Sequence, residues 1–324
     1  MRSMGKRLFV TALVAALITG VLSGCGASVA KAESTTELNI AIQPVVGFLP
    51  LYVMKDTGSL EKALKDNHYD IKINYVEFES GPPENEAFAS KQVDVGVMGN
   101  VPAISGIANG QERAIIGIAY NGEETEAVIV KNESDITAVE QLRGKKIGLV
   151  IGSIAQNYLS VLLENNGLSL SDVELINLST GEQQQALQTG MVDAVATWEP
   201  TLSKLTANGD NRILADGTEI FLGENPIVAR SEYVKANPEI VRIFLEEYKK
   251  AAQLIEDDIP GYASKYADKF LLDKEIVELA LTHAKLQISI TEEDIKDLQN
   301  TADFLYREKL ITREVNIKDY VNIE

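Results

Sequence analysis

Cysteine, tryptophan and histidine are scarce in this sequence of 324 residues. It has one cysteine (Cys25), one tryptophan (Trp198) and two histidines (His68 and His283). A single cysteine excludes a disulfide within the chain. No cluster of His, Cys, Asp or Glu has metal-ligand spacing, and the GxSxG, Walker A and HExxH signatures are missing. We therefore expect no metal, no cofactor and no catalytic centre.

Basic residues are also in short supply. The chain has 30 Lys and Arg against 48 Asp and Glu, which gives a formal net charge of −18. Removal of residues 1–24, which hold three basic residues and no acid, leaves −21. A surface of this sign disfavours nucleic acid and anionic membrane surfaces as partners.

The N-terminus has the layout of a secretory signal. Arg2, Lys6 and Arg7 precede an almost wholly apolar stretch at residues 8–21, which is too short for a comfortable membrane span. Residues 22–25, Leu-Ser-Gly-Cys, resemble a bacterial lipobox, which implies that Cys25 becomes the first mature residue and carries lipid. The alternative is an ordinary signal peptide with a chance cysteine.

These features predict a lipoprotein signal peptide at residues 1–24. They also predict a flexible tether at residues 25–37, which are small and polar. The mature protein is then expected to be anchored to the cell membrane through lipid, palmitate included, and to face the extracytoplasmic side.

The remaining sequence alternates between strand and helix patterns. Apolar β-branched runs at residues 38–42, 71–78, 93–98 and 114–119 are each followed by a turn and, after the first three, a helical pattern, and a second such series begins at residue 127. Helical spacing extends from Leu49 toward Leu64. This α/β alternation predicts mainly parallel sheets flanked by helices.

About 300 mature residues are many for one core and indicate two lobes. We expect the first lobe to contain residues 38–128 and 228–324, and the second to contain residues 129–227. Two crossover strands would then form a hinge that lets the lobes close on a ligand.

Three segments carry a family resemblance. They are VDVGVMGNVP at residues 93–102, LRGKKIG at 142–148 with Gly-Ser at 152–153, and ALQTGMVDA at 186–194 with WEP at 198–200. Together they resemble the periplasmic-binding-protein type II family, in its taurine, aliphatic sulfonate and nitrate branch (an NMT1/THI5-like domain), over residues 38–310.

The resemblance implies the solute-binding component of an ABC importer. Such a protein, as a monomer, captures a small polar or zwitterionic solute by hinge closure and delivers it to a permease with its ATPase. A thiamine-pyrimidine precursor, nitrate or a nitrogenous cation is an alternative ligand, and a structural lipoprotein is an alternative function. The superfamily also includes a pyrimidine synthase that relies on a histidine and a cysteine-rich loop. This chain lacks such a loop, and His68 and His283 lie away from the expected binding turns.

In a doubly wound sheet, ligands bind at the turns that follow the strands. The helix starts at residues 101–102 and 153–154 are expected to present free N–H groups to an anion. The candidate ligand-binding residues are Gln43, Glu79, Gly99, Asn100, Asn121, Gly152, Ser153, Trp198 and Glu199.

Several of these candidates have a purely structural alternative. Ser153 and Glu199 can cap the helices that follow them, Trp198 can fill the core, and Gln43 and Asn100 can stabilise turns.

No expected binding turn contains Arg or Lys, and several contain acids. One hypothesis is therefore that the ligand carries an amine held by acids, with an anionic end on the helix termini. The alternative is that these acids are solvated loop charges. The acids concerned are Glu79, Glu123, Glu124, Glu126, Glu199 and Glu224.

Overall fold

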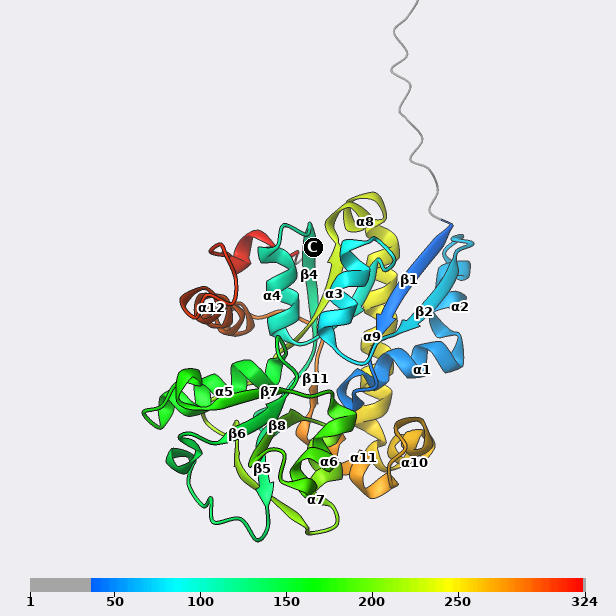
Figure 1. The fold of residues 1–324 in the computed structure, drawn as a ribbon. Coiled ribbons are helices and arrows are strands. Elements are labelled where there is room, and N and C mark those ends of the chain that lie inside the picture. The colour runs from blue at the N-terminus through cyan, green and yellow to red at the C-terminus, as the bar shows by residue number, and fades with distance from the viewer. Residues whose placement is uncertain (1–35, 323–324) are drawn as a thin grey trace, which may run out of the picture. The chain divides into compact units, whose positions relative to one another are not determined.

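The computed structural model describes residues 36–322, so the predicted signal peptide and Cys25 lie outside the described residues. The described part contains two β-sheets flanked by helices (Figure 1). Within it, the first sheet has six strands in the order β11-β4-β10-β3-β1-β2, and the second has five in the order β7-β6-β8-β5-β9.

Both sheets are mixed. In the first sheet β1 pairs in parallel with β2 and β3, whereas β10 is antiparallel to β3 and β4, and β11 to β4. In the second sheet β6 pairs in parallel with β7 and β8, and β5 is antiparallel to β8 and β9. The strands are β1 (Glu37–Ile42), β2 (Lys72–Glu77), β3 (Val95–Val97), β4 (Arg113–Asn121), β5 (Glu126–Lys131), β6 (Lys146–Leu149), β7 (Glu174–Asn177), β8 (Ala194–Trp198), β9 (Asn211–Asp216), β10 (Asn225–Arg230) and β11 (Lys285–Leu286).

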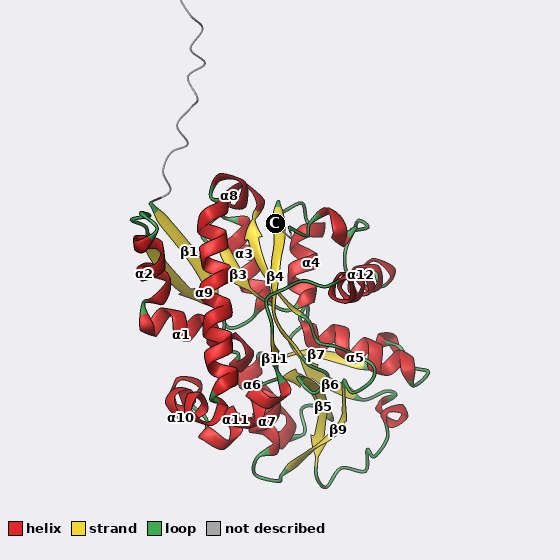
Figure 2. Cartoon of the chain, turned by 180° about the vertical axis from the view of Figure 1, so that it is seen from behind, coloured by secondary structure: helices red, strands yellow, loops and turns green. Residues whose placement is uncertain are grey.

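Helices follow most strands and bury apolar faces against the sheets. The longest, α9, repeats buried apolar residues at helical spacing, from Ile240 and Phe244 to Tyr248, and packs on α1 and α2 (Figure 2). The α-helices are α1 (Leu49–Thr57), α2 (Ser59–Asp66), α3 (Gly81–Ala89), α4 (Asn100–Ala108), α5 (Ile154–Asn165), α6 (Thr180–Thr189), α7 (Thr201–Thr206), α8 (Ser231–Ala236), α9 (Pro238–Asp257), α10 (Ile259–Phe270), α11 (Lys274–His283) and α12 (Glu292–Arg307). Short 3₁₀ helices are η1 (Val46–Phe48), η2 (Val139–Leu142), η3 (Leu170–Asp172) and η4 (Ile317–Asp319).

The single helix expected from Leu49 toward Leu64 is wrong. The chain breaks there into α1 and α2 at Gly58, whose φ of 63° is left-handed. A glycine takes this conformation without the steric cost that a Cβ imposes, so it ends α1 and starts α2 on a new axis.

The chain passes between the sheets twice before β10. It leaves the first sheet between β4 and β5 through residues 122–125, and it returns between β9 and β10 through residues 217–224. The two crossings are hydrogen-bonded to each other, because the Gly122 N–H donates to the Leu222 carbonyl at 2.7 Å. Gly223 has a φ of 66°, and a Cβ there would overlap Glu126 Oε2, so the second crossing requires glycine.

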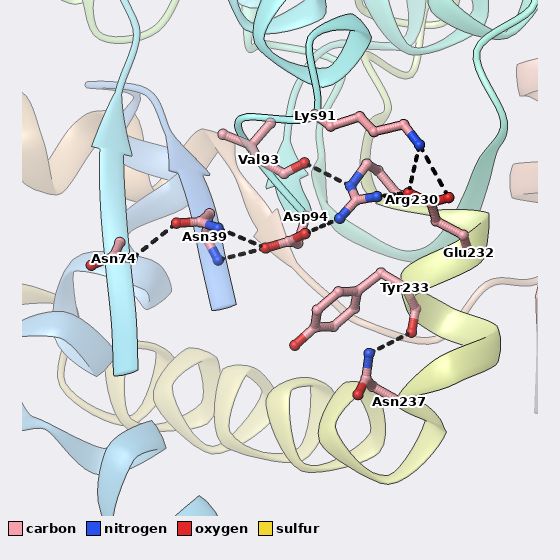
Figure 3. A network of polar contacts seen from close by, with 9 residues as sticks. All are labelled: Asn39, Asn74, Lys91, Val93, Asp94, Arg230, Glu232, Tyr233 and Asn237. Carbon is pink, nitrogen blue, oxygen red and sulfur yellow. Dashed lines mark hydrogen bonds and ion pairs between the residues drawn. The ribbon is translucent and has the colours of Figure 1, made fainter. Parts of the chain in front are cut away.

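Polar contacts tie the strands together at the amino end of β1 and β3 (Figure 3). The buried Asp94 carboxylate accepts from the Asn39 N–H at 2.8 Å and its Nδ2 at 3.0 Å, and pairs with Arg230. Lys91 and Arg230 both pair with Glu232. Two surface hollows of about 370 and 500 Å³ lie here, and their lining charges other than Glu112 have partners within the protein. This end of the sheet therefore has a structural role.

None of the helices in residues 36–322 combines the length and apolarity that a membrane span requires.

Candidate functional site

A small cavity lies where elements of the two sheets meet. Its volume is about 20 Å³, which is more than the ~10–15 Å³ that one water needs. We call it the inner cavity. Its lining residues are Gln43, Val45, Phe48, Gly81, Gly99, Pro102, Tyr120, Ser153, Ile154, Trp198 and Asn225. Four of the nine predicted ligand-binding residues are therefore brought together: Gln43, Gly99, Ser153 and Trp198.

A second hollow of about 180 Å³, which we call the outer groove, shares Val45 and Trp198 with the inner cavity. Apolar side chains and two opposite charges, Glu79 and Lys204, line it. The predicted residue Glu79 therefore lies at this second hollow. The other lining residues are Pro44, Thr180, Gly181, Gln184, Pro200, Thr201, Leu205, Phe270 and Leu272.

The N-terminus of α5 offers unused hydrogen-bond donors to the inner cavity. Ser153 and Ile154 line the cavity, and the N–H groups of Ile154 and Ala155 donate to no group among the described residues. Unpaired N–H groups at a helix N-terminus favour an anion. No charged side chain lines the cavity, so an anion there would be bound by such neutral donors.

The expectation of free N–H groups at residues 101–102 is wrong. Helix α4 begins at Asn100, and the Val101 N–H donates to Asn100 Oδ1 at 2.8 Å. Pro102 has no N–H to offer, and the Asn100 N–H donates to the Glu224 carbonyl at 3.2 Å. The start of α4 therefore satisfies its own donors and contributes only lining surface at Gly99 and Pro102.

Ser153 occupies the N-cap position of α5 with extended backbone, but its side chain does not cap the helix. Its hydroxyl donates to the Val150 carbonyl at 2.7 Å instead. Gly152, with a φ of 79°, donates its N–H to Gln156 Oε1 at 2.8 Å and does not line the cavity. The turn thus leaves the next two N–H groups without a partner among the described residues, and the first of them belongs to a residue that lines the cavity.

Gln43 is held in one orientation from behind the inner cavity. Its Nε2 donates to Glu84 Oε2 at 2.6 Å and to the Val97 carbonyl at 3.2 Å. Both partners accept, so the nitrogen must face them, and Oε1 is the side-chain atom left without a hydrogen bond among the described residues. Gln43 therefore offers the cavity an acceptor, whereas the sequence allowed either role.

Asn100 and Asn121 lie outside the inner cavity. The Asn100 side chain is buried, donates to Thr301 Oγ1 at 3.2 Å and serves the start of α4. Strand β4 extends to Asn121, which lies opposite Lys285 of β11. Because neighbouring strand residues face opposite sides, Tyr120 and not Asn121 lines the cavity.

Glu199 is a structural residue at the start of α7. Its buried carboxylate accepts from the Ser203 N–H at 3.2 Å and the Ser203 hydroxyl at 2.7 Å, and it lines neither hollow. His283 Nδ1 lies 2.9 Å from Glu199 Oε1, so the expectation that His283 lies away from the binding turns is wrong. This hydrogen bond raises the pKa of His283.

Three of the six acids near the expected turns are buried, so the alternative that these acids are solvated loop charges does not hold for those three. Glu126, Glu199 and Glu224 are buried, while Glu123 and Glu124 are exposed. Burial raises the pKa of Glu126 to about 8 and that of Glu224 to about 10. None of these five acids lines the inner cavity or the outer groove.

Sequence reasoning missed Glu84, which belongs to α3 and is completely buried. Burial raises its pKa to about 8, against the hydrogen bond from Gln43 and the attraction of Arg113. Arg113 is itself buried and stacks over Phe88, with its guanidinium carbon 4.3 Å from the ring centre. Glu84 follows Gly-Pro-Pro, a sequence that is typical of an exposed helix start. Nothing in the local sequence therefore predicts that its side chain is buried.

Asn225 and Tyr120 are the other polar lining residues that the sequence did not single out. Asn225 is the first residue of β10, and its Nδ2 donates to the Gly223 carbonyl at 2.8 Å. The sequence could have indicated Asn225, because a polar residue at the start of β10 follows directly after the second crossing between the sheets, and this crossing ends near the site.

Comparison with known proteins places this arrangement in a family. A family model described as NMT1/THI5 like matches residues 60–258. The chain belongs to the NMT1/THI5-like family. A relative described as a putative aliphatic sulfonates-binding protein, from Bacillus subtilis (strain 168), is 34% identical over 96% of this chain and 93% of its own length.

Solved structures show the same fold. The alkanesulfonate-binding protein SsuA from Xanthomonas axonopodis pv. citri, bound to MOPS, superposes with a TM-score of 0.82 and is 29% identical, covering 89% of this chain and 99% of that one. The expected α/β periplasmic-binding-protein fold and family are thereby confirmed.

An enzyme also shares the fold. The desulfurization enzyme DSZB superposes with a TM-score of 0.68 at 18% identity, covering 89% of this chain and 96% of that one. The fold alone therefore does not separate binding from catalysis, although the similar curated relatives of this NMT1/THI5-like protein are described as binding proteins.

Proposed function

We propose that this protein is the extracytoplasmic solute-binding component of an ABC importer for aliphatic sulfonates. The observation that carries the proposal is the N-terminus of α5. Ile154 lines the inner cavity, and the N–H groups of Ile154 and of the next residue, Ala155, have no partner among the described residues. A sulfonate is a small tetrahedral anion, and helix N–H groups bind such anions without a basic side chain. The aliphatic sulfonate and alkanesulfonate names of the relatives support this ligand class.

A tail that reaches beyond Gln43 would extend from the inner cavity into the outer groove. Val45 and Trp198 connect the two hollows, and Phe270 and Leu272 add apolar surface to the groove. Apolar contact of this kind contributes about 0.8 kcal/mol per buried methylene. Glu79 and Lys204 would contact only a polar group on the tail.

Binding would work by closure of two lobes, residues 38–128 with 228–324 against residues 129–227. The inner cavity is too small for a whole alkyl sulfonate, so the ligand must enter while the lobes are apart. Ile154 of α5 packs against Gly99 at the start of α4, where a Cβ on Gly99 would lie 3.0 Å from that of Ile154. A ligand that contacts both lobes favours the closed form in proportion to those contacts.

The rest of the transport cycle would depend on partners. Cys25 would carry the lipid that anchors the protein to the outer surface of the cell membrane, and the closed form would deliver its ligand to a permease driven by an ATPase. The lipobox-like residues 22–25 and the relatives' role in ABC import systems support this part. Labelling with palmitate tests it: the label is expected on the full chain and absent from a Cys25→Ser variant, and equal labelling would refute it.

The ligand class is tested by isothermal titration of the chain from residue 26, which omits Cys25 and its lipid. Ethane-, propane- and butanesulfonate are expected to bind, with sulfate and nitrate bound much more weakly because they cannot fill the outer groove. Binding of nitrate or sulfate alone, or of none of these anions, would contradict the proposal.

A further inference from the structure

The contact between Glu84 and Gln43 determines which polar group faces the ligand. Glu84 Oε2 accepts from Gln43 Nε2 at 2.6 Å, which is the shorter of the two hydrogen bonds that hold the amide. Glu84 lies behind the cavity wall and not in it: its other oxygen packs where a Cβ on Gly96 of β3 would be. Glu84 therefore acts on a ligand only through Gln43.

The surroundings of Glu84 hold it in place. The residue is completely buried, and its Oε1 has no hydrogen-bond partner in the described part of the chain. The buried Arg113 attracts it, while Arg113 is itself held by Gln111 and by the Asn85 carbonyl. Such a buried polar cluster has few alternative arrangements, because each displaced group would lose a partner that water cannot replace.

We propose that Glu84 is a positioning residue that keeps the acceptor oxygen of Gln43 toward the inner cavity, and that the protein thereby selects sulfonates bearing a hydrogen-bond donor. This inference rests on the proposed function. The cavity is then lined by a donor at Ile154, which the N–H of the neighbouring Ala155 extends, and by an acceptor at Gln43. A sulfonate can accept from the N–H donors at the start of α5, and an ammonium or hydroxyl group on a short tail can donate to the Gln43 oxygen.

An unsubstituted alkyl sulfonate would leave the Gln43 oxygen without a donor once water is excluded. A buried polar atom without a partner costs free energy, so sites built for a donor reject isosteres that lack one. The preferred cargo is accordingly an amino- or hydroxyalkanesulfonate of two or three carbons.

Three ligands of matched size test the inference: 2-aminoethanesulfonate, 2-hydroxyethanesulfonate and 1-propanesulfonate. They differ only at the terminal group, which is ammonium, hydroxyl or methyl. For the unmodified protein, titration calorimetry is expected to give a Kd about threefold or more lower for the hydroxyl compound than for propanesulfonate, and about tenfold or more lower for the amine.

In a Glu84→Gln variant, the new amide can either accept from Gln43 Nε2 or donate to Gln43 Oε1, so that only the Val97 carbonyl still favours the original orientation of the Gln43 amide. The Kd ratios are then expected to fall toward one, while propanesulfonate binding is kept. Glu86→Gln, an exposed position on the same helix, is the matched control and should keep the ratios of the unmodified protein. If Glu84→Gln does not fold, Gln43→Met removes the acceptor directly and should also abolish the preference.

The outcomes separate the two proposals. Equal Kd values for the three ligands in the unmodified protein, or ratios unchanged in Glu84→Gln or, in its place, Gln43→Met, would overturn the role of Glu84 and leave sulfonate binding intact. Failure of all three ligands to bind would overturn both.

Discussion

Replacing Ile154 by proline removes the N–H that we propose binds the ligand, together with part of a buried side chain. Ile154 is the first residue of α5, where proline is well tolerated, and the preceding Ser153 already has the extended conformation (φ −104°, ψ 172°) that a following proline requires. The lost N–H has no partner among the described residues, so the helix loses no hydrogen bond. The substitution therefore removes the proposed anion donor without breaking a hydrogen bond of α5, and its loss of apolar side-chain volume is what the control must match.

The expected effect follows from the strength of one hydrogen bond to an ionised group. Such a bond contributes about 1.5–3 kcal/mol, which corresponds to a roughly 10- to 150-fold rise in Kd for every sulfonate. Titration calorimetry with propanesulfonate measures it. Ile154→Val is the control, because it trims the same side chain, at about 0.5–1.5 kcal/mol of stability, and keeps the N–H. A Kd in Ile154→Pro within threefold of that in Ile154→Val would refute the reasoning.

Three further predictions concern the crossing, the buried acids and the outer groove. Gly223→Ala should lower the free energy of unfolding in urea by about 1–3 kcal/mol more than Gly58→Ala. Both glycines have a left-handed φ, but only Gly223 has other atoms at the place where the Cβ would lie. Equal losses of stability in the two variants would contradict this. The pKa of Glu126 is raised by burial from 4.5 to about 8, so the folded state binds more protons between these values and its stability falls as pH rises through this range, by up to ~1.4 kcal/mol per pH unit. Unfolding temperatures from pH 5 to 8.5 should therefore flatten in Glu126→Gln and not in the exposed Glu123→Gln, and identical pH profiles would count against it. Trp198→Ala should reduce the roughly fourfold gain in affinity per added methylene from ethane- to butanesulfonate, and an unchanged gain would place the tail elsewhere.

The regular part of the fold could be predicted because it depends on local patterns. The run at residues 38–42 and the alternation at 71–78 gave β1 and β2 within about a residue at each end. Strand β9 and helix α8 were not predicted, since β9 mixes charged and apolar residues and α8 has only six residues. The antiparallel directions of β5 and β10 depend on long-range pairing and had no local signal.

The residues of the candidate site could be predicted only where their position at the end of a strand places them near the ligand. Gly99, Ser153 and Trp198 follow from the rule that ligands bind beyond the strand ends. Asn100 and Asn121 lie outside the inner cavity, because α4 starts and β4 ends about two residues from where the sequence pattern placed them. The role of Glu84 depends on a contact 41 residues away in the chain, which no periodicity reports.

A crystal structure of the protein grown with propanesulfonate tests the central claim most directly. We expect sulfonate oxygens within about 3 Å of the backbone nitrogens of Ile154 and Ala155, with the tail beside Trp198. A sulfonate bound by surface lysines, or density at the inner cavity that contacts neither nitrogen, would contradict the account.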